Sequence, residues 1–141
     1  MYFDGATNQN GSGIGVLLIS PKGTHIPFSN RLNFPANNNT TEYEACIMGL
    51  QAAPGFGVKE LDVYDDSTLI ISQVQNKWKI KEERLMPYHE CLQKWASKFS
   101  KIQYQCVPRM QNQIADALAT MASMMDGPKE DEARLIVLEQ K

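Results

Sequence analysis

Cysteine is scarce in this sequence, and the few cysteines present do not form a metal-binding pattern. Three of them stand among 141 residues, at Cys46, Cys91 and Cys106. Their spacing matches none of the paired-cysteine patterns of zinc sites, and an odd number argues against a disulfide framework. We therefore expect the three cysteines to be packing residues, and the protein to be in a reducing compartment.

Long hydrophobic runs are also missing. No run approaches the ~18–20 apolar residues of a transmembrane helix, and the N-terminus has no signal-peptide pattern. A length of 141 residues suits one domain with a hydrophobic core and is short for two. We expect this domain over residues 1–125 and a charged tail or linker over residues 126–141. Met1 leads directly into a predicted strand, so we also expect the domain to come from a longer polypeptide.

An excess of positive charge, which is typical of nucleic-acid-binding proteins, is absent as well. The formal net charge is −2, and taken alone this argues against a nucleic-acid partner. The distribution of charge changes that conclusion. Residues 77–109 hold eight basic and three acidic residues, whereas residues 1–66 hold three basic and seven acidic ones. One acidic part and one basic segment are therefore present in the same chain.

The sequence does contain a regular series of strand and helix patterns. Short apolar or alternating runs predict strands over residues 2–6, 14–20, 25–32, 61–65 and 102–106. Apolar residues at helical spacing predict helices over residues 41–53, 67–75, 85–99 and 114–125. The resulting order, βββαβααβα, predicts an α/β fold whose mixed sheet combines an antiparallel meander with parallel strands joined by helical crossovers.

Four carboxylates lie at the ends of these predicted elements. Asp4 is in the first strand, Glu42 begins the first helix, Asp66 follows the fourth strand and Asp116 is in the first turn of the last helix. Strand ends and helix starts on one side of such a sheet can converge in one cleft. Four carboxylates there would repel one another unless cations neutralised them, and hard divalent cations prefer oxygen ligands. Each acid taken alone is also explained by helix capping or by the helix dipole.

The residues around these acids form four ordered motifs. They are Asp4-Gly5-Ala6, the run from Asn38 to Ala45, the run from Asp65 to Val74, and the run from Val107 to Ala119. In this order they resemble the motifs of the type 1 ribonuclease H family, and the likeness extends from Tyr2 to about Ser123. The chain is most similar to the ribonuclease H domains of gypsy-type retrotransposon polyproteins, including their archaeal-type variant.

This resemblance implies a ribonuclease H-like fold with a five-stranded sheet, and endonucleolytic hydrolysis of the RNA strand of RNA/DNA hybrids. It further implies a two-metal mechanism that leaves 5′-phosphate and 3′-hydroxyl ends. The implied cofactors are two Mg²⁺ ions, with Mn²⁺ as a substitute, held by the catalytic acids Asp4, Glu42, Asp66 and Asp116. Asp65 stands where the family commonly has Gly, and we expect Asp65 and Glu44 to take no part. Glu44 is rotated roughly 200° from Glu42, at ~100° per helical residue.

The implied partners are the RNA/DNA hybrid and the reverse transcriptase and integrase domains of the same polyprotein. By position, one group of residues would contact the hybrid backbone and 2′-hydroxyls: Gly5, Asn10, Asn37, Asn38 and Asn39. A basic segment with a stacking aromatic would follow the DNA strand: Lys77, Trp78, Lys79 and Lys81. Two further contacts are predicted near the last strand, Arg109 and Asn112. For the asparagines the alternative is turn chemistry, and for the basic segment it is a solvated loop.

One position departs from the family pattern. The family commonly has a mobile His ten residues before the last Asp, where this chain has Cys106. A thiol is a poor substitute for imidazole in proton transfer near neutrality, so we predict a slow enzyme. The main alternative is a non-catalytic hybrid-binding module that retains the fold. An exonuclease or integrase of the same general fold and a non-enzymatic α/β scaffold are further alternatives. We expect an intracellular monomer without membrane contact, in the cytoplasm, nucleus or a virus-like particle.

Overall fold

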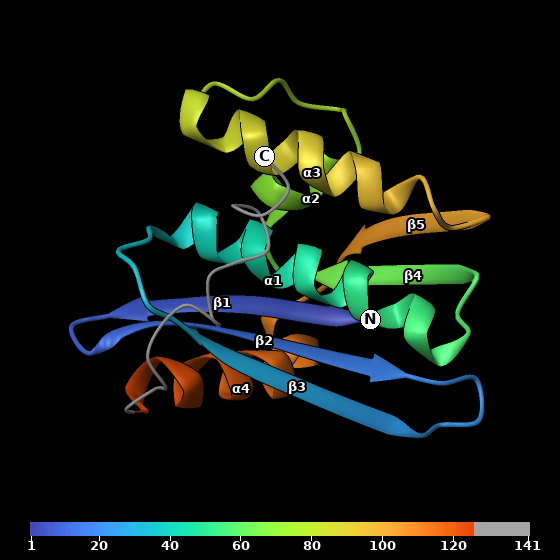
Figure 1. Ribbon diagram of the computed structural model, residues 1–141, viewed down its shortest axis with the longest axis horizontal. Helices are drawn as coiled ribbons and strands as arrows, with labels where there is room; N and C mark the ends of the chain where they lie inside the picture. The colour runs from blue at the N-terminus through green and yellow to red at the C-terminus, as the bar shows by residue number, and fades with distance from the viewer. Residues whose placement is uncertain (126–141) are drawn as a thin grey trace.

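One mixed β-sheet forms the centre of the molecule in the computed structural model, which describes residues 1–125 (Figure 1). Its strands are β1 (Tyr2–Asn8), β2 (Gly11–Ile19), β3 (His25–Leu32), β4 (Glu60–Asp65) and β5 (Lys101–Cys106). They lie in the order β3-β2-β1-β4-β5, so β1 is the central strand. The first three strands pair antiparallel, whereas β1, β4 and β5 pair in parallel. The predicted five-stranded mixed sheet is confirmed, and the predicted tail, residues 126–141, lies outside the described residues.

Helices cover both faces of the sheet, as the predicted order requires. They are α1 (Asn38–Ala52), α2 (Thr68–Val74), α3 (Met86–Ala96) and α4 (Gln113–Met124), with short 3-10 helices at Ala53–Phe56, Glu83–Leu85 and Arg109–Asn112. Figure 1 shows α1, α2 and α3 on one side of the sheet and α4 on the other. Pro87 lies in the first turn of α3, where its missing N–H costs no helical hydrogen bond.

The hydrophobic core lies between the sheet and α1. Phe3, Val16 and Val63 point from three strands toward Tyr43 and Ile47 of α1, and all five side chains are fully buried. Because successive strand residues point to opposite faces, the residues between them on β2 face α4 instead. The core therefore fixes which side of each strand meets which helix.

Small residues let α4 approach the other face closely. A Cβ placed on Gly15 of β2 would lie 2.5 Å from the Ala115 carbonyl oxygen and 2.7 Å from the Ala119 nitrogen. Gly13 meets the same helix in the same way, and Ala115 and Ala119 are fully buried against the sheet. The backbones of β2 and α4 can touch only because Gly13 and Gly15 have no Cβ. Glycine therefore sets the distance between α4 and the sheet.

The connection between β1 and β2 differs from the predicted loop over residues 7–13. Both strands extend into that stretch, and only Gln9 and Asn10 form the turn. The Asn8 side chain accepts a hydrogen bond from the Asn10 N–H at 2.8 Å, and Gly11 has φ 145°. Such turn chemistry is favourable for Asn and Gly, and here it allows a hairpin within a stretch too polar to look like strand.

Among the described residues, no helix has the length and apolar character needed to cross a membrane.

Candidate active site

Carboxylates from two parallel strands meet at one end of the sheet. Tyr2 pairs with Tyr64 across β1 and β4, so Asp4 and Asp66, each two residues further on, reach the same level. An oxygen atom from each of Asp4, Asp65 and Asp66 lies within 4.8 Å of the other two. We call these three residues the acid cluster.

Glu42 approaches the acid cluster from α1. Its Oε2 accepts a long hydrogen bond, 3.4 Å, from the Gly5 N–H, which also donates to Asp4 Oδ1 at 2.9 Å. Its carboxyl group also contacts those of Asp4 and Asp65, where a hydrogen bond requires a shared proton. A side chain at Gly5 would collide with Thr41, so the missing Cβ allows α1 to bring Glu42 to β1.

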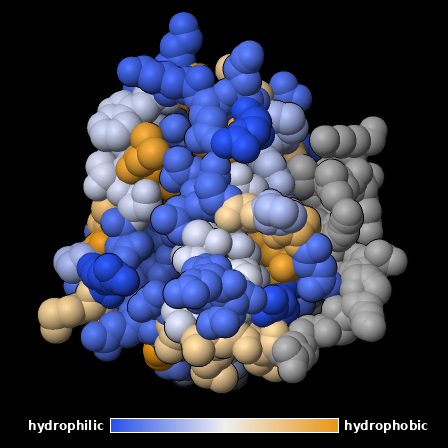
Figure 2. All heavy atoms as spheres, turned by 90° about the vertical axis from the view of Figure 1, so that its left-hand side faces the viewer, coloured by the Kyte–Doolittle hydropathy of each residue, from blue (hydrophilic) through white to orange (hydrophobic). Residues whose placement is uncertain are grey.

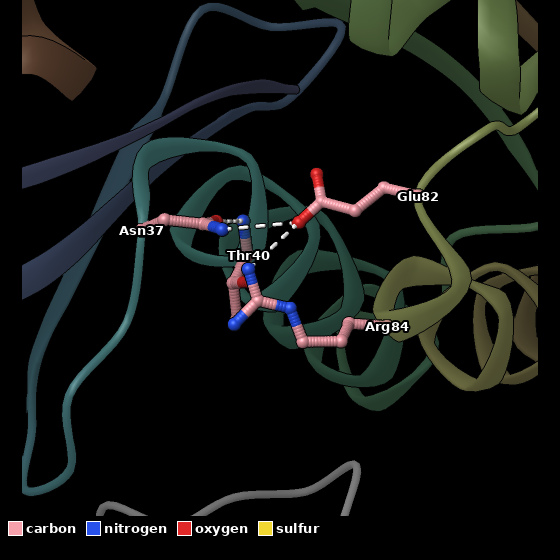
Figure 3. Close-up of polar contacts among 4 residues, drawn as sticks. All are labelled: Asn37, Thr40, Glu82 and Arg84. Atoms are coloured by element: carbon pink, nitrogen blue, oxygen red, sulfur yellow. Dashed lines mark hydrogen bonds and ion pairs between the residues drawn. The ribbon is translucent and has the colours of Figure 1, made fainter.

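The start of α1 is fixed by a side-chain cap that also connects it to the segment before α3. Asn37 Oδ1 accepts a hydrogen bond from the Thr40 N–H at 2.8 Å, and Asn37 Nδ2 donates to Glu82 Oε2 at 3.2 Å. Arg84 pairs with the same carboxylate at 3.2 Å (Figure 3). This cap begins the helix earlier than the predicted Thr41 and places Glu42 in its second turn.

Asp116 is close to the acid cluster but does not belong to it. It lies in the first turn of α4, half-buried, and its charge contributes to the raised pKa of Asp4. The close approach of α4 at Gly15 brings it there, because Gly15 pairs with Asp4 across β1 and β2. The structure thus brings all four predicted acids to one end of the sheet.

Asp65 was not predicted to bind metal, and that stays a prediction, but its side chain lies beside those of the predicted ligands Asp4 and Asp66. Its side chain is completely buried and within the acid cluster. Its Oδ2 accepts a hydrogen bond from the Ser67 N–H, and its Oδ1 accepts one from Asn112 Nδ2, both at 3.2 Å. The signal was present in the sequence: Leu61, Val63 and Asp65 alternate on one face of β4, and the first two are core residues.

Glu44 points elsewhere, as the helical rotation predicts. It is buried, with 1% of its surface exposed, and its carboxyl group contacts Tyr88 of α3. It therefore lies between two helices rather than at the acid cluster.

Burial and mutual repulsion raise the pKa values of the clustered acids. Burial is the largest cause for each: it raises the pKa of Asp4 to about 6 and that of Asp65 to about 8. The pKa of Glu42 is raised well above its usual value by burial and then by the charge of Asp65. Keeping these carboxylates ionised and close together costs free energy, and a bound cation would offset that cost.

The donor set fits a hard divalent cation. All the groups that converge are carboxylates, the ligands that Mg²⁺ and Mn²⁺ prefer. Glu42 Oε1 is buried and accepts no hydrogen bond within the described residues. A buried carboxylate oxygen without a donor is costly in a protein interior and favourable beside a cation.

The predicted basic segment forms one wall of a groove near the start of α1. The groove has a volume of about 620 Å³ and is lined by Lys77, Trp78, Lys79 and Lys81 together with Asn39, Leu69, Gln73, Glu82 and Leu85. Half of the Trp78 surface is exposed, which leaves its ring available for stacking. Figure 2 shows that the end of the molecule with the β1–β2 turn and the start of α1 is mostly hydrophilic.

The remaining predicted contacts differ in accessibility. Asn10, Asn38 and Arg109 are exposed. Asn112, in contrast, has only 1% of its surface exposed, and its amide donates to Phe3 O at 2.9 Å as well as to Asp65. The structure therefore gives Asn112 partners within the protein.

Cys106 ends β5 at the same end of the sheet. Its thiol is exposed and lies 3.5 Å from the Thr68 hydroxyl. The residue at the position where the family commonly has His is therefore accessible to solvent and lies beside the acid cluster.

This strand order, with acids from β1, β4, α1 and α4 at one end, defines a ribonuclease H-like protein. Residues 2–122 match the family model described as reverse transcriptase-like. The chain is also similar to the crystal structure of RNase H1 from the halophilic archaeon Halobacterium salinarum NRC-1. The sequences are 31% identical, and the TM-score is 0.81, with 86% of this chain and 93% of that one covered. The chain therefore belongs to the ribonuclease H-like family.

Two further relatives extend the comparison. LC11-RNase H1 in complex with an RNA/DNA hybrid has a TM-score of 0.78 and 31% identity, covering 86% of this chain and 93% of that one. A bifunctional protein of Mycobacterium tuberculosis (strain ATCC 25618 / H37Rv) is 40% identical over 87 residues. That match covers 62% of this chain and 24% of the relative, so the chain spans about a quarter of that protein.

Proposed function

We propose that this protein hydrolyses the RNA strand of RNA/DNA hybrids at internal positions, leaving 5′-phosphate and 3′-hydroxyl ends. The observation that carries the proposal is the convergence of Asp4, Glu42, Asp66 and Asp116 at one end of the sheet. The similarity to an RNase H1 solved with an RNA/DNA hybrid supports the choice of substrate.

We assign two divalent ions, Mg²⁺ or Mn²⁺, to these four acids. When bound, such ions supply activation of water and stabilisation of negative charge during phosphoryl transfer. The chain itself orients the acids: the Gly5 N–H holds Asp4 and Glu42 together, and the backbone contact at Gly15 brings Asp116 toward Asp4. Burial limits the access of bulk water to Asp4 and Glu42.

Binding of the hybrid uses the surface on either side of these acids. Asn10 and Asn38 are exposed, and we assign them contacts with the RNA backbone and 2′-hydroxyls. The groove lined by Trp78 and the three lysines would hold the DNA strand, because an aromatic ring stacks on bases or sugars while cations neutralise phosphates. Asn39 lines this groove as well.

We further propose that the domain works within a retroelement polyprotein beside reverse transcriptase and integrase domains. The description of the matching family, reverse transcriptase-like, supports this context. In such an assembly the neighbouring domains would add to the affinity for the hybrid.

The proposal is tested by cleavage of end-labelled RNA in a hybrid with Mg²⁺, with Mn²⁺ and with chelator. Asp66→Asn is expected to abolish cleavage, while substitution of Asp62, an exposed carboxylate on the preceding strand β4, by Asn is expected to leave it unchanged. Duplex DNA should remain intact. Binding of the hybrid without cleavage under either metal would refute the catalytic proposal and support the non-catalytic hybrid-binding module.

A further inference from the structure

A buried amide connects three of the elements that carry the acids. Asn112 immediately precedes α4 and is buried, and its Nδ2 donates to Phe3 O of β1 at 2.9 Å and to Asp65 Oδ1 of β4 at 3.2 Å. Phe3 is the neighbour of Asp4, and Asp65 is the neighbour of Asp66. Asp116 follows Asn112 by four residues, about one helical turn. One side chain thus fixes the start of α4 to both strands of the acid cluster.

Asp65 extends this connection to the fourth element. Its two oxygens already accept from Asn112 and from the Ser67 N–H, and its carboxyl group also contacts that of Glu42 on α1. It is completely buried, whereas Asp66 is partly accessible. Because both of its oxygens already have hydrogen-bond donors, its carboxylate is suited to orient other groups. Because the resembled motif commonly has Gly at this position, the connection is a feature of this chain.

We propose that Asp65 and Asn112 are a pair of positioning residues, which hold Glu42 and the start of α4 in register with Asp4 and Asp66. A carboxylate that must hold a cation needs its own orientation fixed by further hydrogen bonds, and loss of such a bond typically costs about 10–100-fold in metal affinity or activity. Misplacement of reacting groups by ~1 Å has effects of similar size. The inference rests on the proposed function, through hybrid cleavage for its kinetic readout and through the assigned divalent ions for its Mg²⁺ readout.

The test compares Asn112→Ala and Asp65→Ala with the double variant and with a matched control. Ser123→Ala is the control, because Ser123 is buried on the same helix and its hydroxyl bonds Asn8 of β1 at 2.8 Å, at the other end of α4. For each protein we would measure the melting temperature without metal, the rise in melting temperature on titration with Mg²⁺, and kcat and KM for hybrid cleavage.

Each single variant is expected to lower kcat and apparent Mg²⁺ affinity about tenfold or more, with KM for the hybrid within about twofold. The double variant should lose no more than either single variant, because the two residues act as a unit. Asp65→Asn, which keeps an acceptor oxygen for Asn112, should retain Mg²⁺ affinity within about threefold. Asn112→Ser keeps a short donor and replaces Asn112→Ala if the latter fails to fold.

Three results would overturn the proposal. Equal losses of kcat and Mg²⁺ affinity in Ser123→Ala would show a general effect of loosening α4. Independent, multiplying losses in the double variant would show that the pair does not act as a unit. Loss of Mg²⁺ binding in Asp65→Asn, equal to that in Asp66→Asn, would make Asp65 a ligand. If the unmodified protein cleaves no hybrid, the proposed function fails separately, and the Mg²⁺ titrations still decide the positioning role.

Discussion

Cys106 lies opposite Asp65 at the last paired position of β4 and β5. This pairing puts an exposed thiol beside the acid cluster, at the end of the strand where the family commonly carries His. An imidazole there can accept and release protons near neutrality, whereas a thiol is less suited to do so.

We therefore expect Cys106→His to raise kcat for hybrid cleavage by a few-fold, with KM unchanged. Steady-state cleavage of labelled hybrid across pH 6–9 measures this. Cys106→Ser is the matched control and should behave like the unmodified protein. A Cys106→His variant with unaltered kcat would show that another step limits turnover.

Gly15→Ala should destabilise the fold. The added Cβ would lie 2.5 Å and 2.7 Å from backbone atoms of Ala115 and Ala119, and overpacking of this kind costs roughly 1–3 kcal/mol. Urea denaturation measures the change in the free energy of unfolding. Gly55→Ala is the control, because no atom lies within 4 Å of a Cβ at Gly55. Equal effects of the two substitutions would contradict close backbone packing at Gly15.

The metal-free protein should lose stability as the pH rises from 5 to 9. Burial raises the pKa of Asp4 from 3.8 to about 6 and that of Asp65 from 3.8 to about 8. The folded protein thus binds these protons more tightly than the unfolded chain. Their stabilisation is complete below pH 3.8 and is lost as the pH rises through the two folded pKa values.

Melting temperatures measured with chelator at several pH values should therefore fall between pH 5 and pH 9. Asp65→Asn should reduce this fall, and Glu60→Gln, at the exposed start of β4, should not. Mg²⁺ should raise the melting temperature more at pH 8 than at pH 5, because the ionised carboxylates bind it. A melting temperature that rises with pH in chelator would contradict the assigned pKa directions.

Trp78→Ala should weaken binding of the hybrid without affecting the chemical step. The ring is half exposed on the wall of the groove, and loss of one stacking contact, ~1.4 kcal/mol, raises KM roughly tenfold. Kinetics at two salt concentrations would measure this, with kcat expected to stay the same. Lys22→Ala in the β2–β3 turn is the control. A fall in kcat with unchanged KM would place the role of Trp78 outside binding.

Much of this fold could be predicted from the sequence because its strands and helices follow clear apolar periods. The strand containing Leu61 and Val63 and the helix containing Tyr43 and Ile47 are examples, and both contribute to the core. The β1–β2 pairing was predicted, but the extension of both strands into residues 7–13 was missed, because these residues are polar or glycine. Their pairing depends on the neighbouring strands and on α4 rather than on their own patterns.

The site was predictable to a similar degree. The four acids at element ends could be named from their positions, but the inward direction of Asp65 depends on the register of β4 in the sheet. Asn112 was predicted to contact nucleic acid, since its motif gave no indication that the side chain is buried. Its burial arises only when α4 closes onto β1 and β4, which is a tertiary effect.

The contact of α4 with Gly13 and Gly15 has a consequence for protein engineering. Glycine already allows the closest approach of α4 to the sheet, so substitution at Gly13 or Gly15 can increase this distance but not reduce it. A methyl group at Gly15 would push α4 outward and move Asp116 away from Asp4. No residue assigned to substrate binding would change. The spacing of the acids could thus be changed through glycines between the sheet and α4, which take no part in the reaction.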